Sequence, residues 1–513
     1  MFVTRSWGYW HSKDLLNWDF ITPEKWYFEG CNAPAAHNYK DSVLYVCGNP
    51  SGAMSILYTD NPKRGDWKAV PSVLHDLQDP ALFIDDDERA YMYWGSSNRW
   101  PIRGKELDMK NKFLPIAKKP DSLLFLRPDI HGWERFGENH TSDIKPFIEG
   151  AWMTKHNGKY YLQYAAPGTQ FNVYGDGVYV GKSPLGPFEY AAHNPFCYKP
   201  GGFATGAGHG STVCGPGGIY WHFGTIHLSI NYKFERRLCM FPTFFDEDGA
   251  MYSDTYFGDY PHYSPDQVSR QTTSGGFRGW MLLSYGKPVK ASSQLESYPV
   301  ENVTDENLKT FWVAEKNDDK QWVEIDLEEV SDVYALQLNF FDYEETGFWG
   351  RMPNLRQRYL VEASVDGARW RVLVDYRNSF RDAPHNYIEL DQPIEARYIR
   401  YRHHYVPGKN LAMGDIRVFG LGRGKKPATV KGFTVVREAD ERNARISWKA
   451  VKGAQGYNVL WGVALDKLYS SWMVYGDNSL DLRALTVGQK YYFAIEAFNE
   501  NGISQRVFLR EAH

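Results

Sequence analysis

Short apolar runs separated by polar turns recur throughout the first half of the chain. Clusters of Asp, Asn, Gly and Pro interrupt runs rich in Tyr, Val, Leu and Phe, and this alternation predicts antiparallel strands joined by turns. Hairpins with polar tips are expected at residues 38–48, 81–95, 153–165 and 211–224. Outer strands with a polar turn and an aromatic residue are expected at residues 9–20, 57–70, 178–190 and 236–252.

The spacing of these hairpins indicates a repeating architecture. Units of roughly 45–60 residues, each made of short antiparallel strands, are typical of a β-propeller. We expect an all-β fold with about five units between residue 1 and about residue 265, and therefore a five-bladed β-propeller. The first unit is expected to be incomplete, because Met1 to Thr4 resembles the middle of a strand and the inner hairpin would lie before Met1.

The second half of the chain predicts two β-sandwiches. Alternating or apolar stretches at 321–330, 358–373 and 396–420 predict strands of a sandwich over residues 277–421. A further set predicts a second sandwich over residues 428–513. Small and polar residues at 266–276 and 422–427 are interpreted as linkers between the three regions.

Composition agrees with several β-rich domains and excludes some classes of function. The 513 residues suffice for two to four domains, and 16% of them are aromatic, including 18 Trp. The net charge is −4 without a long basic run, so nucleic acid is not an expected partner. No apolar run reaches the ~20 residues of a membrane-spanning helix. The five Cys lack CxxC spacing and are interpreted as small buried residues rather than as disulfide or zinc sites.

Glu149 is the first candidate for acid–base chemistry. It opens a predicted hairpin whose turn is Asn157-Gly158, two residues that tolerate the positive φ of a type I′ turn. Gly150 and Trp152 flank the carboxyl group, so we expect it to be partly desolvated. Desolvation favours the protonated form, which suits a proton donor near neutral pH. The alternative is a Glu that merely ends a strand.

Asp79 stands at the start of the preceding predicted hairpin. Pro80 follows it and should hold it in extended geometry. A turn-forming Asp-Pro is the alternative, but the equivalent position of Glu149 one unit later favours a functional role. By contrast, Asp85, Asp86 and Asp87 lie at a hairpin tip and are interpreted as a solvated charge run.

Five motifs in one order carry a resemblance to a known family. They are SKDLLNW, an Asp-Pro before LFIDDDERAYMYWG, EGAW before KHNGKYYLQYA, GHGS at 208–211, and RRLCMFPTFFDEDG. Together, over about residues 1–265, the chain resembles glycoside hydrolase family 43. The resemblance implies a five-bladed propeller that inverts configuration while it removes arabinofuranosyl or xylosyl units from plant polysaccharide.

The resemblance also implies roles for individual residues. Glu149 matches the general acid, and Asp79 matches a carboxylate that orients the acid and modulates its pKa. His209 matches a His that points into the central channel, often near a calcium ion or water, although a structural His in a crowded core is as plausible. Arg237 matches a substrate-binding Arg, with Arg236 as the alternative because alternation points only one of them inward. The general base of the family would lie before Met1, so it is unknown here.

Aromatic residues supply candidate surfaces for sugar binding, because sugar C–H faces stack on aromatic rings. In the first region the candidates are Trp10, Trp94, Trp100 and Trp152. In the middle region Phe348 and Trp349 lie in a predicted loop, where exposed aromatic residues favour binding. That region resembles a discoidin (coagulation-factor C-type) domain, a sandwich often used to bind carbohydrate. The last region resembles fibronectin type III, with Trp448 in its core and a hydroxyl of Tyr491 bonded to upstream backbone.

These observations favour a secreted or periplasmic glycosidase of the α-L-arabinofuranosidase or β-xylosidase type. The sequence does not decide between the two sugars. The alternative is a propeller that binds carbohydrate without cleaving it, since the general base is missing; an adhesion protein explains the propeller motifs less well. No cofactor is required, a calcium ion near His209 is compatible with the resemblance, and this chain shows no signal peptide. The oligomeric state stays open.

Overall fold

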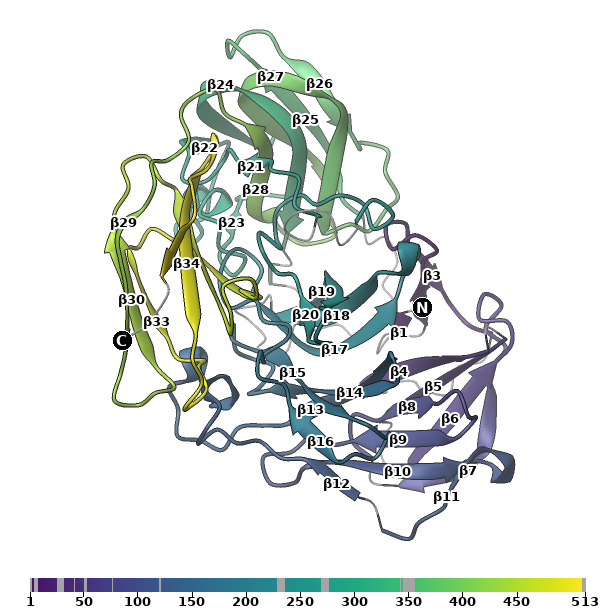
Figure 1. Ribbon diagram of the computed structural model, residues 1–513. Helices are drawn as coiled ribbons and strands as arrows, with labels where there is room; N and C mark the ends of the chain where they lie inside the picture. The colour runs from purple at the N-terminus through teal and green to yellow at the C-terminus, as the bar shows by residue number, and fades with distance from the viewer. Residues whose placement is uncertain are drawn as a thin grey trace.

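The computed structural model is an all-β chain (Figure 1). It describes residues 2–3, 8–24, 32–40, 42–49, 53–75, 77–119, 121–227, 236–268, 276–341, 343–344 and 356–509. Within these ranges the helical elements are 3-10 turns of three or four residues: η1 (Met109–Asn111), η2 (Gly132–Glu134), η3 (Glu138–His140), η4 (Pro216–Gly218) and η6 (Val300–Val303). The all-β class predicted from the sequence is therefore confirmed. No helix in the described part of the chain is both long and apolar enough to cross a membrane.

Among the described residues, the first region contains five antiparallel sheets whose strands follow chain order, except that β12 pairs with β10 rather than with β11. The first sheet comprises β1 (Phe2–Val3), β2 (Tyr9–His11) and β3 (Asp19–Ile21), and the second comprises β4 (Asn32–Tyr39), β5 (Val43–Asn49), β6 (Ala53–Thr59) and β7 (Lys68–His75). The third comprises β8 (Ala81–Ile84), β9 (Ala90–Trp94), β10 (Ile102–Asp108), β11 (Leu114–Pro115) and β12 (Asp121–Leu124). The fourth comprises β13 (Glu149–His156), β14 (Lys159–Ala166), β15 (Gly175–Gly181) and β16 (Phe188–Tyr190), and the fifth comprises β17 (Gly206–Cys214), β18 (Tyr220–His227), β19 (Arg236–Phe245) and β20 (Met251–Ser253).

The first strands of successive sheets lie against one another. Contacts join β1 to β4, β4 to β8, β8 to β13 and β13 to β17. The fifth sheet returns to the first, because Trp18 meets Phe223 edge to face and Leu15 packs into a cluster with Trp221. Residues at the beginnings of these first strands are thus brought together. The contacts agree with the radial arrangement expected for a propeller, and the number of blades stays a prediction.

The hairpin of β13 and β14 forms as its sequence predicts. His156 pairs with Lys159, and the two residues between them have positive φ, 46° at Asn157 and 73° at Gly158. These values are those of a type I′ turn. The turn fixes the register of the hairpin and places Glu149 at its inner end, opposite Ala165.

The middle region is one eight-stranded antiparallel sheet that folds on itself around a core of Val, Ile, Leu and aromatic residues. Its strands are β21 (Met281–Leu282), β22 (Val289–Ala291), β23 (Trp312–Val313), β24 (Trp322–Phe340), β25 (Arg358–Ser364), β26 (Arg371–Asp375), β27 (His385–Tyr405) and β28 (Ala412–Leu421). The long strands β24 and β27 pair over most of their length. Phe348 and Trp349, the predicted binding loop, lie outside the described residues.

The C-terminal region comprises two sheets. One contains β29 (Lys431–Arg437), β30 (Ala444–Lys449) and β33 (Ser479–Leu482); the other contains β31 (Gly456–Gly462), β32 (Ser470–Tyr475), β34 (Tyr492–Asn499), β35 (Gly502–Ile503) and β36 (Val507–Leu509). Trp448 is buried, and the backbone N–H of Thr486 donates to the hydroxyl of Tyr491 at 3.2 Å, which is the predicted contact with upstream backbone. The relationship to fibronectin type III and the boundaries of the three regions stay predictions.

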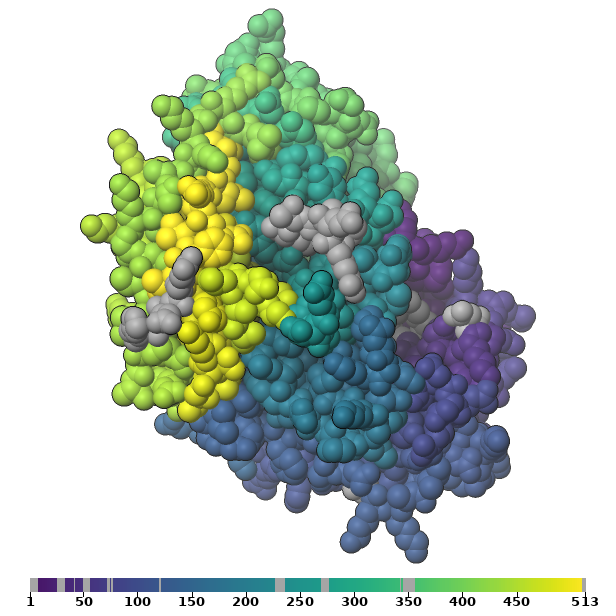
Figure 2. Space-filling view, in the orientation of Figure 1, coloured from purple at the N-terminus to yellow at the C-terminus, as the bar shows by residue number. Residues whose placement is uncertain are grey.

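The three regions pack against one another (Figure 2). At their meeting point, Arg417 of the middle region is buried and binds both carboxylate oxygens of Glu306. The same guanidinium donates to the backbone oxygen of Asp259 at 2.7 Å, and the Tyr475 hydroxyl of the C-terminal region donates to Glu306 at 3.3 Å. One buried ion pair therefore links all three regions and fixes how the middle region sits over the fifth sheet.

Two minor sequence predictions are wrong. Cys214 is exposed rather than buried, because it lies at the outer end of β17. Asp85 is not part of a solvated charge run: it is 7% exposed, and it accepts hydrogen bonds from Lys155 and from the Tyr160 hydroxyl of the neighbouring sheet.

Candidate active site

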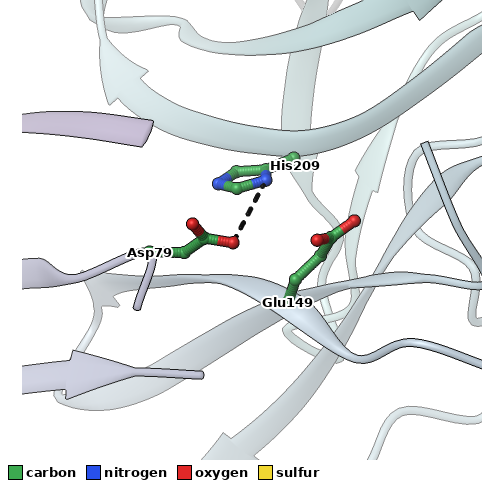
Figure 3. A group of neighbouring side chains, drawn as sticks. All are labelled: Asp79, Glu149 and His209. Atoms are coloured by element: carbon green, nitrogen blue, oxygen red, sulfur yellow. Dashed lines mark ion pairs between the residues drawn. The ribbon is translucent and has the colours of Figure 1, made fainter. Parts of the chain in front are cut away.

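Asp79, Glu149 and His209 converge at the inner ends of three neighbouring sheets (Figure 3). Asp79 lies two residues before β8, Glu149 is the first residue of β13, and His209 lies on β17. One carboxylate oxygen of each acid and one ring nitrogen of His209 lie within 4.8 Å of one another. The Nδ1 atom of His209 is 3.9 Å from an Asp79 oxygen. The two acids singled out from the sequence are thus neighbours in space.

The backbone around the cluster adopts unusual conformations. Asp79 has φ of 49° and His209 has φ of 53°, both in the left-handed region. The extended geometry expected for Asp79 before Pro80 is therefore wrong. Such conformations cost of order 1–3 kcal/mol at non-glycine residues and persist only where surrounding contacts hold them.

Asp176 provides that support at His209. Its carboxylate is fully buried and accepts the backbone N–H groups of His209 and Gly210, each at 2.8 Å. The Asp176 oxygen that accepts from Gly210 also lies 3.0 Å from the Nε2 atom of His222. Gly150 packs beneath His209, and a Cβ atom there would lie 3.0 Å from the His209 ring. This segment accordingly needs a glycine at position 150.

Two hydroxyl groups hold the carboxylate of Glu149. Ser96 donates to Oε2 at 3.0 Å, and Tyr174 donates to Oε1 at 2.6 Å. Burial raises the pKa of the Tyr174 hydroxyl well above its ordinary value, so this residue acts as a hydrogen-bond donor. Sequence reasoning missed both residues. The position of Ser96 could have been recognised: Asp79 precedes the 81–95 hairpin and Ser96 follows it, so both residues stand at the same end of that hairpin. Tyr174 lies in a loop, and no sequence pattern marks it.

Asp79 is the acid whose titration the site perturbs. Burial raises the pKa of its carboxyl group above the ordinary value, and the negative charge of Glu149 adds to that effect. His209, Ser96 and Arg236 act in the opposite direction.

A small cavity of about 270 Å³ lies beside the cluster. It is lined by the neighbours of both acids, Pro80 and Gly150, and by His209, Trp152 and Arg236. The indole N–H of Trp152 donates to the backbone oxygen of Thr212 at 3.1 Å, which fixes the ring. Of the predicted aromatic residues, Trp152 therefore lies at this cavity.

The other predicted tryptophans lie elsewhere. Trp94 is 8% exposed and packs in a hydrophobic core with Leu82 and Met92, so no ring face is open to a sugar and its predicted stacking role is wrong. Trp100 is 63% exposed and lines a separate surface cavity. Trp10 lines a second, larger cavity next to the first.

The two adjacent arginines, Arg236 and Arg237, differ in the cavities that they line. Arg236 lines the small cavity, lowers the pKa of Asp79 and donates to the Thr169 hydroxyl at 2.8 Å. Arg237 lines only the larger cavity, beside His385. Alternation along β19 does point one of the pair to the acids, but that residue is Arg236. The preference for Arg237 is corrected accordingly.

The positions of the acids restrict the chemistry they can do together. An inverting glycosidase keeps its acid and base about 6.5–9.5 Å apart so that a water fits between them. The nearest oxygens of Asp79 and Glu149 are within 4.8 Å, which is too close for that arrangement. No carboxylate is among the described residues that line the small cavity. The general base stays unassigned.

The cluster does not fit calcium well. Calcium takes six to eight oxygen ligands, whereas the groups brought together here are two carboxylates and an imidazole nitrogen. Both oxygens of Glu149 are already hydrogen-bonded to hydroxyl groups. We therefore derive no step through a metal ion.

Comparisons with known proteins match two parts of the chain. Residues 2–251 match Glycosyl hydrolases family 43, and residues 288–413 match the F5/8 type C domain. A beta-xylosidase of Xylanibacter ruminicola is 33% identical over 133 residues, which are 22% of this chain and 39% of that protein. An arabinoxylan arabinofuranohydrolase of Bacillus subtilis is 30% identical over 189 residues, 32% of this chain and 34% of that protein. The chain thus spans less than half the length of these curated relatives. A solved glycoside hydrolase structure shares 20% identity at a TM-score of 0.44, over 80% of this chain and 89% of the other.

Proposed function

We propose that this chain, which carries a domain of glycosyl hydrolases family 43 and an F5/8 type C domain, is an inverting glycosidase of plant polysaccharide. It would remove terminal arabinofuranosyl or xylosyl units. The observation that supports this most is Glu149, held by two hydroxyl donors near the half-buried Asp79 and next to residues that line a small cavity. The named activities of the relatives include both sugars.

Glu149 is the general acid in this proposal. It protonates the glycosidic oxygen as the bond from that oxygen to the anomeric carbon breaks, so the leaving group departs as an alcohol. Ser96 and Tyr174 hold the carboxyl group in one orientation, which matters because proton transfer requires hydrogen-bond contact. Asp79 positions and tunes the acid through the negative charge it can carry next to it.

Arg236 and His209 are proposed as substrate-binding residues. Both line the cavity, and both carry donors that can reach sugar hydroxyl groups. Trp152 supplies an aromatic wall. The attacking water adds to the anomeric carbon from the opposite face and gives its proton to a base that is not assigned.

The size of the cavity favours removal of one sugar at a time. Pockets for drug-sized ligands have volumes of about 300–1,000 Å³. A cavity of about 270 Å³ is smaller and suits a single pentose rather than a polysaccharide segment. Pentofuranose and pentopyranose rings differ too little in size for this volume to distinguish them.

A second candidate function is sugar binding without cleavage. The carboxylate-free lining of the described cavity favours it, because hydrolysis with inversion needs a base. The two candidates are distinguished by hydrolysis: the glycosidase turns over a glycoside, and the sugar-binding protein does not.

The test compares wild type with Glu149→Gln on 4-nitrophenyl α-L-arabinofuranoside and 4-nitrophenyl β-D-xyloside. We expect wild type to release nitrophenol from one of the two aryl glycosides. Both proteins are also assayed on the natural glycan, where the leaving group needs a proton, and there we expect Glu149→Gln to lower kcat by at least about 10²-fold. Glu189→Gln, an exposed residue of β16, is the matched control. If wild type turns over neither substrate class, the second candidate is favoured. If Glu149→Gln cleaves the natural glycan as fast as wild type does, the acid role of Glu149 is contradicted. NMR of the first-formed anomer tests inversion.

We further infer that the first region, residues 1–265, is a five-bladed propeller, that residues 277–421 form the discoidin-like sandwich, and that residues 428–513 form a fibronectin type III-like domain. The circular contacts of the five described sheets support the first of these. Export from the cell is part of the proposal, since the substrate is an extracellular polymer.

A further inference from the structure

A second cavity, of about 740 Å³, lies between the first region and the F5/8 type C domain. One wall comes from the first and fifth sheets and includes Trp10, Trp18 and Arg236; the other wall is the start of β27, with Pro384 and His385. In Figure 1 the sandwich that contains β27 sits above β18 and β19. The volume falls within the range of about 300–1,000 Å³ that ligand pockets occupy.

This interdomain cavity adjoins the small cavity beside Glu149. Phe223, Thr225, Arg236 and Leu238 line both. A glycan whose terminal residue occupies the small cavity therefore has room to continue into the larger one. In that arrangement the leaving group would fill the interdomain cavity.

His385 lines the interdomain cavity and carries a hydrogen-bond acceptor without a partner. Its Nδ1 atom is 3.0 Å from Oδ1 of Asn339, whose amide nitrogen in turn donates to the backbone oxygen of Asp415 at 2.8 Å. Because Oδ1 can only accept, the His385 proton is on Nδ1 and a lone pair is on Nε2. The Nε2 atom is buried and has no hydrogen-bond partner within the described structure.

His385 also stays neutral. Burial lowers its pKa to about 3, and the nearby positive charge of Arg237 acts in the same direction. A neutral imidazole with a bare Nε2 needs a donor, and a sugar hydroxyl group supplies one. Buried polar atoms in proteins are nearly always paired, so an unpaired acceptor on a residue that lines a cavity is a candidate partner for a ligand hydroxyl group.

The opposite wall supplies the apolar part of a sugar site. Trp10 contacts Phe20 through its edge, with ring centroids 5.2 Å apart, and Trp18 contacts Phe223 in the same way at 6.2 Å. Edge contacts hold these half-buried rings, and indole faces match sugar C–H faces. No carboxylate lines the cavity among the described residues, which favours neutral sugars that interact through hydroxyl groups.

We propose that the interdomain cavity binds the glycan residues on the leaving-group side of the cleaved bond, and that the F5/8 type C domain contributes His385 to this site. The inference rests on the proposed function for its direction along the glycan. The domain then forms part of the substrate site and is not only an independent sugar-binding module. The buried Arg417–Glu306 pair keeps it in place.

The test uses His385→Phe, which keeps a ring but removes the acceptor, and His404→Phe, an exposed residue of the same strand, as the matched control. Binding of xylotetraose and of arabinofuranosyl-substituted xylotetraose is measured by calorimetry on the full chain, each variant being combined with Glu149→Gln to prevent turnover. We expect His385→Phe to weaken binding of at least one probe about tenfold and His404→Phe to have no effect.

The outcomes separate this inference from the proposed function. Equal affinity of His385→Phe and its parent, or no measurable binding of either probe, overturns the interdomain site even when the aryl glycoside is cleaved. Weakened binding in a chain without turnover on any substrate supports the site and contradicts the glycosidase. If His385→Phe melts at a lower temperature than wild type, Trp18→Ala on the opposite wall decides in its place, and unchanged affinity of that variant overturns the inference.

Discussion

Tyr174 donates its hydroxyl proton to Oε1 of Glu149 over 2.6 Å, from a loop 25 residues further along the chain. The tyrosine is buried, so this hydrogen bond is not exchanged for one with bulk water. This hydrogen bond and the one from the Ser96 hydroxyl together hold the carboxyl group of Glu149 in one orientation. The relationship makes Tyr174 a positioning residue for the proposed acid.

Replacing Tyr174 by Phe should therefore lower activity without unfolding the chain. Hydrogen bonds between neutral groups contribute about 0.5–1.5 kcal/mol, so we expect kcat to fall by about 2- to 10-fold. Steady-state kinetics on the 4-nitrophenyl glycoside and on a natural oligosaccharide measure the change. Tyr161→Phe, whose hydroxyl bonds to the Gly249 backbone oxygen away from the acids, is the control. Equal kcat values for the two variants would show that Tyr174 does not position Glu149.

A buried acid outside the site should make stability depend on pH. Glu134 is fully buried, and burial raises its pKa to about 8, although the Tyr164 hydroxyl and the Arg127 backbone N–H bond to it. The unfolded chain ionises this group near 4.5, so between that pH and about 8 the folded state holds one proton more. Stability contributed by Glu134 is thus complete below about pH 4.5 and is lost as the pH rises toward 8.

Glu134→Gln should remove that dependence. The amide stays neutral, so the variant should gain stability relative to wild type as the pH rises from 5 to 8, by at most about 4 kcal/mol. Thermal unfolding at intervals of pH measures the difference. A constant difference between the two proteins over this range would contradict the raised pKa.

Sequence reasoning succeeded where the determinants are local. The β13–β14 hairpin follows from Asn157-Gly158 and from the strand residues that flank the turn, and it places Glu149 at the inner end. The Asp-Pro at position 79 was found in the same way. That the two acids meet could be expected only from the repeat, since their spacing in the chain says nothing of their distance.

The predictions that failed depend on residues distant in the chain. Asp85 is buried because Lys155 reaches it from the next sheet, 70 residues away. Trp94 fills a core between the second and third sheets, which no local pattern distinguishes from an open platform. The left-handed backbone at Asp79 likewise follows from how the sheets meet, and the preference of residues before proline is overridden.

Arg236 and Arg237 should differ in their effects on the aryl glycoside. Removal of the Arg236 charge takes away one of the groups that lower the pKa of Asp79. In Arg236→Ala the pKa of Asp79 should therefore rise, and the part of the pH–rate profile that depends on this group should move to higher pH. Arg237→Ala should leave that profile in place, because Arg237 lines only the interdomain cavity. Identical profiles for both variants would contradict the assignment of Arg236 to the site.

Gly150 and Gly158 form a matched pair for a final test of the site geometry. Both have positive φ, 65° and 73°, so alanine at either position is strained by of order 1 kcal/mol. They differ in their surroundings: a Cβ at 158 meets nothing within 4 Å, whereas a Cβ at 150 lies 3.0 Å from the Cα and ring atoms of His209.

The backbone of His209 cannot yield easily, because Asp176 anchors it through two N–H groups. Gly150→Ala should consequently displace the neighbouring Glu149 or the His209 ring and lower kcat/KM by at least tenfold. Gly158→Ala should lower the melting temperature, because its backbone strain is like that of Gly150→Ala, but it should keep the kcat/KM of wild type. Thermal unfolding and kinetics on one substrate measure both quantities. If the two variants keep the same kcat/KM, the contact between Gly150 and His209 does not shape the site, and the tight cluster of Asp79, Glu149 and His209 loses its functional meaning.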